Sequence, residues 1–355
     1  MRRYGIEPST ATSQAQKQQA SQQPFEPLPA PTGAAPFRLA STTLEIPAAG
    51  ATRGLHVIGD SGGVQDPKPQ AAVASALIAD LTTHPEVAFL YHVGDVDYFN
   101  GARAEYVPQF FEAYAHYVRP ILAIPGNHDG DPEEGSGEAS LSAFVRYFCA
   151  KTAQLPPEVE EYNRDTMTQP NVYWTLTDEL VTIVGLYSNV PQGGQIEADQ
   201  AKWLSEELAA AAKNRALIVA LHHPPYSADA MHGGSTKMGQ VLDAAFASSG
   251  RTPDLVITGH VHNFQRFTRT IGSKQLPYIV CGAGGYHNLH AMATGAKPGL
   301  KVTEDTVLEA FDATQWGFLR LTVSTSAIEG EYVGVASNGT VKADVDHFTV
   351  KLAAA

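Results

Sequence analysis

Short apolar runs that end at glycine, aspartate, asparagine or histidine recur along this chain, and they constrain its fold more than any other feature. The clearest cover residues 55–58, 89–93, 121–124, 217–221, 255–258 and 278–280. Continuous apolar runs of this length, bounded by turn residues, are typical of strands that are buried on both faces. Helical patterns over residues 71–81 and 197–213 lie between them. This alternation predicts an α/β fold in which helices cover central sheets.

The last part of the chain has a different pattern. Leu319, Leu321 and Val323 alternate with polar residues, and further strand-like segments lie on either side of Asn338-Gly339. Alternation with a period of two is typical of strands, and Asn-Gly favours a tight hairpin turn. We therefore expect a meander of strands that continues one of the sheets. No linker-like segment interrupts the chain after residue 37, so residues 37–355 are predicted to form one catalytic domain.

Residues 1–36 form a separate compositional zone. Glutamines among Ala and Ser are followed by closely spaced prolines up to Pro36. Such a segment buries too little apolar surface to offset its ordering entropy. We expect a flexible Gln/Pro-rich arm whose proline part is extended. A role of this arm in docking a partner stays open.

The charge balance bears on possible partners. The 355 residues contain 24 Lys and Arg against 37 Asp and Glu, a formal net charge of -13. A chain this acidic is a poor non-specific binder of nucleic acid or of an anionic membrane, so neither is expected as a partner. No apolar run of signal-peptide length follows Arg2-Arg3, which predicts a cytoplasmic protein, or a periplasmic or secreted one if a signal was removed. Cys149 and Cys281 are expected to be separate buried thiols.

Five short motifs follow five of the strand-like runs, each within a few residues. In chain order they begin at Gly59 (Gly-Asp-Ser-Gly), Gly94 (Gly-Asp-Val-Asp-Tyr), Gly126 (Gly-Asn-His-Asp), His222 (His-His-Pro) and Gly259 (Gly-His-Val-His). Loops that leave neighbouring strands meet at one edge of a sheet, where ligands bind in α/β folds. The motifs can therefore bring together seven donor side chains: Asp60, Asp95, Tyr98, Asn127, His222, His260 and His262.

The donor set consists of oxygen and imidazole ligands without a thiolate, which suits hard or borderline metal ions. Seven candidates are too many for one ion with an open position, so we expect two ions. A carboxylate can bridge two ions, and Asp95 is the natural bridge because its loop also carries Tyr98. A pair of ions about 3.5–4 Å apart is the clamp used for in-line phosphoryl displacement.

These five motifs resemble those of the calcineurin-like metallophosphoesterase superfamily, and within it the chain is most similar to the purple acid phosphatases. The family patterns GDxG, GDxxY, GNH, HxP and GHxH are all present, from about Leu55 to the C-terminus. The resemblance implies a four-layer α/β/β/α sandwich. The wider superfamily mostly has a histidine where this chain has Gly62, and Tyr98 supplies the missing donor.

The resemblance also implies how the ligands divide. One ion is held by Asp60, Asp95, Tyr98 and His262, and the other by Asp95, Asn127, His222 and His260. A phenol with an ordinary pKa of about 10 binds as phenolate only to a strong Lewis acid, which favours Fe(III) at the first site. The second ion is Fe(II), Zn or Mn, and the sequence leaves that choice open.

Two further histidines receive roles from the resemblance. His128 is expected near the leaving group, where it donates a proton or a hydrogen bond. His232 is expected to contact the substrate phosphate. In the motif at residue 222 the pattern selects His222 as the ligand, and strand alternation is expected to send His223 to the opposite side.

We therefore expect a metal-dependent phosphate-ester hydrolase, an acid phosphomonoesterase in which a metal-bound hydroxide attacks phosphorus. One alternative is a phosphodiesterase that acts on cyclic nucleotides or phospholipid head groups. An alternative of another class is a metal-binding interaction protein without turnover. The sequence names neither the physiological substrate nor the oligomeric state.

Overall fold

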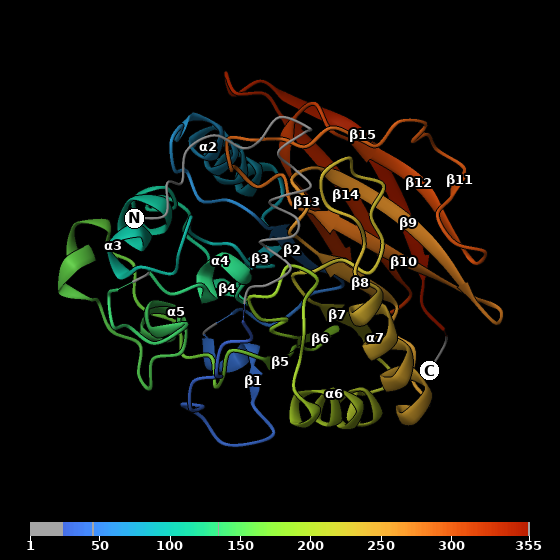
Figure 1. Cartoon of the computed structure of the whole chain (residues 1–355), viewed down its shortest axis with the longest axis horizontal. Coiled ribbons are helices and arrows are strands. Elements are labelled where there is room, and N and C mark those ends of the chain that lie inside the picture. Colours follow the sequence, from blue (N-terminus) through green and yellow to red (C-terminus); the bar gives the residue numbers. More distant parts are fainter. Residues whose placement is uncertain (1–23, 45, 134, 354–355) are drawn as a thin grey trace.

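A computed structural model describes residues 24–44, 46–133 and 135–353. Two sheets pack face to face, and helices cover the outer face of each sheet (Figure 1). The layers therefore follow the order α/β/β/α, which confirms the predicted sandwich. The six-stranded sheet consists, in spatial order, of β15 (Val341–Lys351), β14 (Ala327–Val335), β13 (Trp316–Val323), β2 (Arg53–Ile58), β3 (Val87–His92) and β4 (Ile121–Ala123).

The second sheet has nine strands. Their spatial order is β1 (Arg38–Ala40), β5 (Trp174–Thr177), β6 (Val181–Gly185), β7 (Ala216–Ala220), β8 (Leu255–Thr258), β10 (Lys274–Cys281), β9 (Phe264–Ile271), β12 (Thr306–Asp312) and β11 (Leu300–Lys301). The α-helices are α2 (Lys68–Thr83), α3 (Arg103–Tyr106), α4 (Asn127–Gly130), α5 (Ser142–Phe148), α6 (Ala198–Ala210) and α7 (Thr236–Ser249). Short helical segments are η1 (Ser41–Leu44), η2 (Val107–Glu112) and η3 (Pro157–Tyr162).

The central strands are continuous apolar runs because each of their faces enters a different core. In β2, Val57 packs between the two sheets, whereas the next residue, Ile58, packs with α2 on the outside. In β7, Ile218 enters the core between the sheets and Val219 packs under α6 and α7. Successive side chains of a strand point to opposite faces, so both faces must be apolar. The prediction of doubly buried strands is confirmed.

The C-terminal meander extends the smaller sheet, as predicted. Strand β13 pairs antiparallel with β2, and β14 and β15 follow as antiparallel neighbours. The Asn338-Gly339 pair lies in the connection between β14 and β15, where Gly339 has a φ of +81°. A positive φ is favourable for glycine, so the turn chemistry that the sequence indicates is the one used. Both cysteines are free and buried, which confirms two separate thiols.

Residues 24–36, the described part of the predicted arm, lie against the domain. The Glu26 N–H donates to Asn189 Oδ1 and the Glu26 carbonyl accepts from Asn189 Nδ2, both at 2.9 Å. Further along, the Pro36 carbonyl accepts a hydrogen bond of 2.7 Å from Trp203 Nε1. Hydrogen bonds thus hold this part of the arm to the body. Residues 1–23 lie outside the described residues, so the flexibility of the arm stays a prediction.

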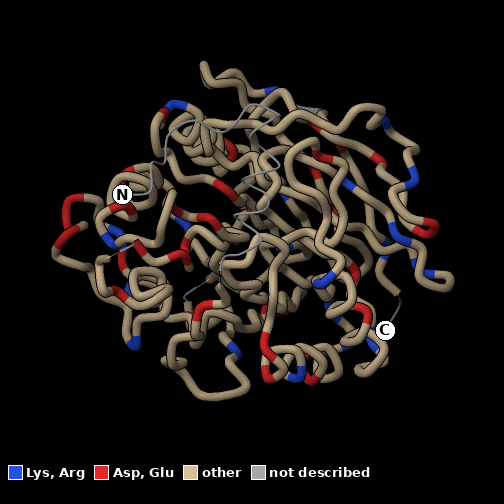
Figure 2. The backbone as a smooth tube through the Cα atoms, viewed as in Figure 1, with Lys and Arg blue, Asp and Glu red and all other residues tan. Residues whose placement is uncertain are grey.

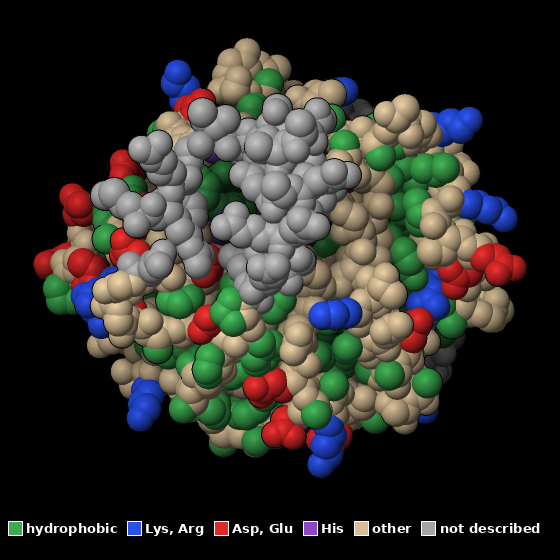
Figure 3. Space-filling model, in the orientation of Figure 1, with side chains coloured by type: hydrophobic (Ala, Val, Ile, Leu, Met, Phe, Trp, Pro, Cys, Tyr) green, Lys and Arg blue, Asp and Glu red, His purple; other side chains and the backbone are tan. Residues whose placement is uncertain are grey.

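The charges are distributed rather than gathered. Along the described residues, Lys and Arg are interspersed with Asp and Glu and form no single long stretch (Figure 2). On the face shown in Figure 3, charged side chains lie mainly around the rim, and hydrophobic ones show between them in the lower half. Among the described residues, no helix combines the length and apolar character needed to cross a bilayer. The expectation that nucleic acid is not a partner stays a prediction.

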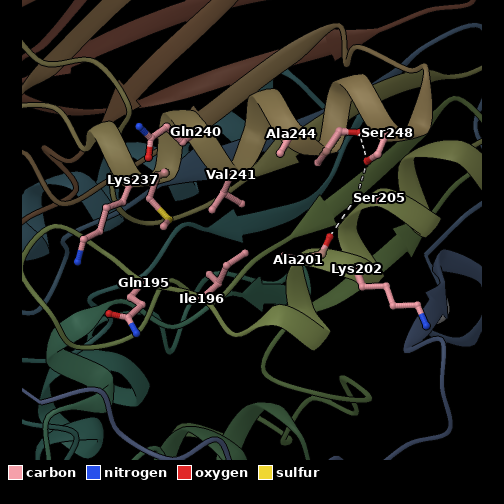
Figure 4. A pocket seen from close by; sticks show the side chains of 12 residues that line it. Gln195, Ile196, Ala201, Lys202, Ser205, Lys237, Gln240, Val241, Ala244 and Ser248 are labelled. Atoms are coloured by element: carbon pink, nitrogen blue, oxygen red, sulfur yellow. Dashed lines mark hydrogen bonds between the residues drawn. The ribbon is translucent and has the colours of Figure 1, made fainter.

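Helices α6 and α7 enclose a groove on the outer side of the larger sheet (Figure 4). Its walls include Ile196, Ala201 and Val241, and a hydrogen bond of 2.9 Å between Ser248 Oγ and Ser205 Oγ joins the two helices beside it. None of the seven predicted ligands lines this groove. The groove is therefore separate from the site described next.

Candidate metal centre

The predicted ligands come from loops at one edge of both sheets. Strands β2, β3 and β4 are parallel neighbours in the smaller sheet, and β7 and β8 are parallel neighbours in the larger one. The carboxyl ends of parallel neighbours lie at the same edge of a sheet. The segments directly after these five strands carry, in chain order, Asp60, Asp95, Asn127 (the first residue of α4), His222 and His260, all of which are buried.

One group of donors forms around Tyr98. Its hydroxyl lies 3.2 Å from Asp60 Oδ1 and 3.2 Å from His262 Nε2. His262 Nε2 is itself 3.6 Å from Asp60 Oδ1. The three side chains come from loops after β2, β3 and β8, so the fold and not local sequence brings them together. This group contains three of the four ligands predicted for the first ion.

A second group forms around Asp95. Its carboxylate, an imidazole nitrogen of His222 and one of His260 lie within 4.8 Å of one another, as expected of a metal site. Asn127 Oδ1 lies 3.0 Å from His260 Nδ1 and completes the set predicted for the second ion. The two groups touch, because the His260 backbone N–H donates to Asp60 Oδ2 at 2.8 Å. All seven predicted ligands are therefore brought together in one place.

Backbone carbonyls fix the orientation of two of the candidate imidazole ligands. His222 Nδ1 lies 2.9 Å from the Val93 carbonyl, and His262 Nδ1 lies 3.1 Å from the Asn288 carbonyl. A carbonyl only accepts, so each Nδ1 carries a proton, and in the neutral imidazole the lone pair lies on Nε2. His222 Nε2 is buried, lies 3.2 Å from Asp95 Oδ2 and has no aligned hydrogen-bond partner among the described residues. An imidazole held in this way is suited to bind a metal.

The electrostatics of the cluster follow from burying opposite charges together. Burial lowers the pKa of His222, but the charges of Asp95 and Asp60 outweigh it and raise this pKa to about 9. Burial alone would raise the pKa of Asp95, yet the charges of His222 and His128 hold it well below its usual range. Burial, together with the charge of Asp95, raises the pKa of Asp60. A cation fits here because it takes the place of the proton that these acceptors otherwise share.

Gly62 provides the room that Tyr98 needs. A Cβ atom at position 62 would lie 2.8 Å from Tyr98 Cδ2 and 2.4 Å from Gln109 Oε1. Both distances are shorter than real Cβ contacts. Gln109 in turn accepts from the Tyr98 N–H at 3.0 Å and donates to the Tyr98 carbonyl at 2.6 Å. The tyrosine therefore occupies space that a side chain at position 62 would fill.

The two remaining predicted histidines lie beside this cluster. The His128 ring is 4.5 Å from the Tyr98 ring, and its Nδ1 lies 2.8 Å from the Phe99 carbonyl, which leaves Nε2 as the nitrogen with a lone pair. The His128 backbone N–H donates to Asp95 Oδ1 at 2.9 Å. The His232 ring lies 4.8 Å from the His260 ring. Both are therefore adjacent to candidate ligands, as their predicted roles require.

One expectation about this region is wrong. His223 does not point to the side opposite His222, because its ring lies 4.3 Å from the ring of His260. Strand β7 ends at Ala220, so the alternation of a strand no longer applies at positions 222 and 223. His223 Nδ1 instead lies 2.7 Å from Ser188 Oγ.

No motif marks several other polar neighbours of the candidate ligands. Gln192 Nε2 lies 2.9 Å from His260 Nε2 and 3.3 Å from His232 Nδ1. The His290 ring lies 4.3 Å from the ring of His262, and its Nδ1 is 3.6 Å from Asp229 Oδ1. These residues lie on loops without a motif. A Pro-Gln-Gly-Gly turn, as at residues 191–194, is too common to indicate a site.

Asp129, which follows the third motif, organises the loops around the second group. Its carboxylate accepts from the Val96 N–H at 3.1 Å, the Gly126 N–H at 2.7 Å and the Tyr106 hydroxyl at 2.8 Å. Val96 follows the candidate bridge Asp95, and Gly126 precedes Asn127. One buried carboxyl group therefore sets the spacing between two of the predicted ligands.

Curated relatives match part of the chain. Purple acid phosphatase 21 of Arabidopsis thaliana is 27% identical over 175 residues, which cover 47% of this chain and 37% of that protein. Purple acid phosphatase 22 of the same plant is 24% identical over 231 residues, which cover 60% of this chain and 50% of that protein. The chain thus spans half or less of the length of these relatives.

Two solved structures share the architecture. GAP50, the anchor in the inner membrane complex of Plasmodium, has a TM-score of 0.58 at 16% identity, covering 86% of this chain and 90% of that chain. PhoD has a TM-score of 0.55 at 13% identity, covering 92% and 72%. At such identities the likeness shows the fold alone. The sequence pattern of the calcineurin-like phosphoesterases, however, matches residues 55–264, more than half of the chain and all seven candidate ligands, so this protein belongs to the calcineurin-like phosphoesterase family.

Proposed function

We propose that this protein hydrolyses phosphate monoesters at a dinuclear centre in which Fe(III) is paired with Fe(II), Zn or Mn. The observation that carries the proposal is the position of Tyr98, whose hydroxyl is 3.2 Å from both Asp60 Oδ1 and His262 Nε2. A buried phenol between two other metal-binding groups has few structural uses. The similarity to purple acid phosphatases supports the same assignment.

The chain supplies two overlapping ligand sets. We assign to the first ion Asp60, Asp95, Tyr98 and His262, and to the second ion Asp95, Asn127, His222 and His260. When bound, two such ions polarise a phosphoryl group and lower the pKa of a coordinated water. The protein's own part is to hold these donors in fixed orientations, which it does through the Val93 and Asn288 carbonyls behind His222 and His262.

The environment of Tyr98 explains why ferric iron is proposed for the first ion. Burial raises the pKa of Tyr98, and the charges of Asp60 and Asp95 raise it further. A phenol in such surroundings loses its proton only to a strongly polarising cation. Fe(III) meets this requirement better than a divalent ion does, and a phenolate bound to it absorbs visible light.

We assign contacts with the substrate itself to two histidines. We propose that His128 is the catalytic acid: the Phe99 carbonyl holds its Nδ1–H, and in the imidazolium form its Nε2–H can donate a proton to a leaving oxygen. We propose that His232 contacts the phosphate, because its ring lies 4.8 Å from that of the candidate ligand His260. Both proposals need a substrate that reaches the edge formed by these loops.

The test uses the colour of the protein. Full-length protein loaded with iron under oxidising conditions should be pink to purple, and Tyr98→Phe should bleach it while Asp60 and His262 still retain iron. Metal content is measured on the same samples. Wild-type protein that contains Fe(III) but is colourless would overturn the assignment of Tyr98. Turnover of a monoester and of a bis-ester by the coloured protein then separates a phosphomonoesterase from a phosphodiesterase, and absence of both would indicate a metal-binding protein without turnover.

A further inference from the structure

His260 differs from the other two candidate histidine ligands in the hydrogen-bond partner of the ring nitrogen that points away from the site. His222 and His262 each present Nδ1 to a backbone carbonyl, which leaves Nε2 for an ion. In His260 the two ring nitrogens exchange these roles: Nδ1 faces the candidate ligand Asn127 and lies 3.0 Å from Asn127 Oδ1. The outer nitrogen is therefore Nε2, and its hydrogen-bond partner is the side-chain amide of Gln192, 2.9 Å away.

This arrangement has a consequence for the proton on His260. An ion bound at Nδ1 needs the lone pair of that nitrogen, so the proton must lie on Nε2. Nε2–H then needs an acceptor, and the amide nitrogen that lies 2.9 Å away can only donate. The two ends of an amide have nearly the same size, so a half-turn of the Gln192 amide places its oxygen at that position without other movement.

We infer that Gln192 is a positioning residue for the second ion: its amide oxygen accepts from Nε2–H of His260 and thereby holds Nδ1 toward Asn127. The inference rests on the proposed function, because it assigns His260 to a metal site. Outer partners of this kind fix the tautomer and the ring orientation of ligand histidines. Gln192 takes the place that the Val93 and Asn288 carbonyls have behind the other two rings.

The same amide connects the metal ligand to the candidate substrate contact. Gln192 Nε2 also lies 3.3 Å from His232 Nδ1. After the half-turn, one amide oxygen faces both His260 Nε2 and His232 Nδ1, and an sp² oxygen has two lone pairs with which to accept from both. The orientation of His232 is thereby tied to the metal-competent tautomer of His260. No motif marks Gln192, which lies on the loop between β6 and α6.

The variants separate an acceptor from a space-filling group. Gln192→Met has a similar size and no acceptor, whereas Gln192→Glu keeps an oxygen at the same reach. Gln195→Met is the matched control, because Gln195 is exposed three residues further on and lines the groove between α6 and α7 (Figure 4). Calorimetric titration of Zn²⁺ into the full-length, metal-free proteins measures both binding events. Circular dichroism verifies that each variant is folded.

For wild type we expect two zinc-binding events. In Gln192→Met one of them should weaken by about 10–100-fold and the other should be unchanged, as for loss of an outer partner of a metal ligand. Gln192→Glu should retain both events, and Gln195→Met should match wild type. In zinc-loaded protein labelled with ¹⁵N-histidine, long-range ¹H–¹⁵N spectra should show the proton of His260 on Nε2.

The outcomes distinguish the inference from the function on which it rests. Wild-type protein that binds no zinc would overturn both. Two binding events that are equally tight in wild type and in Gln192→Met would overturn the role of Gln192 alone. Equal weakening in Gln192→Met and Gln192→Glu would also overturn it, because an acceptor would then not be what matters. A His260 proton on Nδ1 in the zinc-loaded protein would contradict the tautomer directly.

Discussion

Replacing Gly62 by alanine tests whether this glycine is present to make room for Tyr98. The added Cβ would lie 2.8 Å from Tyr98 Cδ2, and ordinary contact begins at 3.4 Å, so the ring would have to move by about 0.6 Å. Metal-binding side chains must lie within about 0.5 Å of their productive positions. The displacement that one methyl group requires therefore exceeds the tolerance of the site.

The surroundings leave the methyl group no easier escape. On its other side lies Gln109 Oε1, 2.4 Å from the new Cβ, and Gln109 is fixed by two hydrogen bonds to the Tyr98 backbone. The Tyr98 ring itself is stacked on Tyr286, with centroids 4.0 Å apart. Inserting a methyl group into a packed region of this kind costs about 1–3 kcal/mol of stability. The strain falls on Tyr98 because it borders the methyl group both directly and through Gln109.

We expect Gly62→Ala to lower the free energy of unfolding by about 1–3 kcal/mol in urea titrations. After iron loading under oxidising conditions, its visible band should be weakened or lost. Gly50→Ala is the control, since a Cβ at residue 50 meets nothing within 4 Å, and it should change neither quantity. A Gly62→Ala protein with wild-type stability and an unchanged band would refute the reasoning, because Tyr98 would then not need that space.

Three further outcomes are expected. His128→Ala should lower kcat by about 10²–10⁴-fold with both metals bound, and the loss should be smallest for esters with good leaving groups; equal losses for all esters would count against a proton donor. Arg53→Met removes one partner of a buried ion pair, in which the Arg53 and Asp178 side chains are 4% and 0% exposed. It should lower the free energy of unfolding in urea by about 3–5 kcal/mol, and a loss below about 1 kcal/mol would show that the ion pair does not stabilise the fold. Hydrogen bonds from Arg146 hold the pKa of Glu158 at about 2, below its ordinary 4.5, so its contribution to stability is present above pH 4.5 and lost as the pH falls toward 2. Glu158→Gln should therefore reduce the change of the unfolding midpoint with pH across that window. An unchanged pH dependence would exclude Glu158 as its source.

The sequence predicts where the candidate ligands lie because each stands at a fixed place relative to a strand. Asp60, Asp95 and Asn127 follow strands whose apolar runs are evident, and parallel pairing then brings them to one edge. These positions can be predicted without knowing the loop conformation beyond its first few residues. The same reasoning fails one residue later at His223, where the strand has ended and the loop bends the ring toward His260.

The sequence reveals much less about the surroundings of the ligands. Gln192 and His290 reach the site from loops with no periodic pattern, and a polar loop residue has many possible neighbours. Helix α7 is hard to predict for a related reason: it begins within a segment that contains glycines and polar residues. Its start is set by Ser235, whose hydroxyl accepts from the Met238 N–H at 3.1 Å, a cap that only the folded chain distinguishes from an ordinary loop serine.

The backbone itself helps to arrange the candidate ligands. Asp60, Asp95 and His260 have φ values of 56°, 54° and 68°, a left-handed conformation that L-residues rarely adopt. Such residues cost about 1–3 kcal/mol each and persist when their surroundings over-determine them. Here the Asp60 N–H donates to the Gly94 carbonyl at 2.9 Å and the Ser61 N–H to the Asp95 carbonyl at 3.1 Å, so the first two loops hold each other. Hydrogen bonds between the two loops thus hold Asp60 and Asp95 in this strained conformation and keep the donors facing one another.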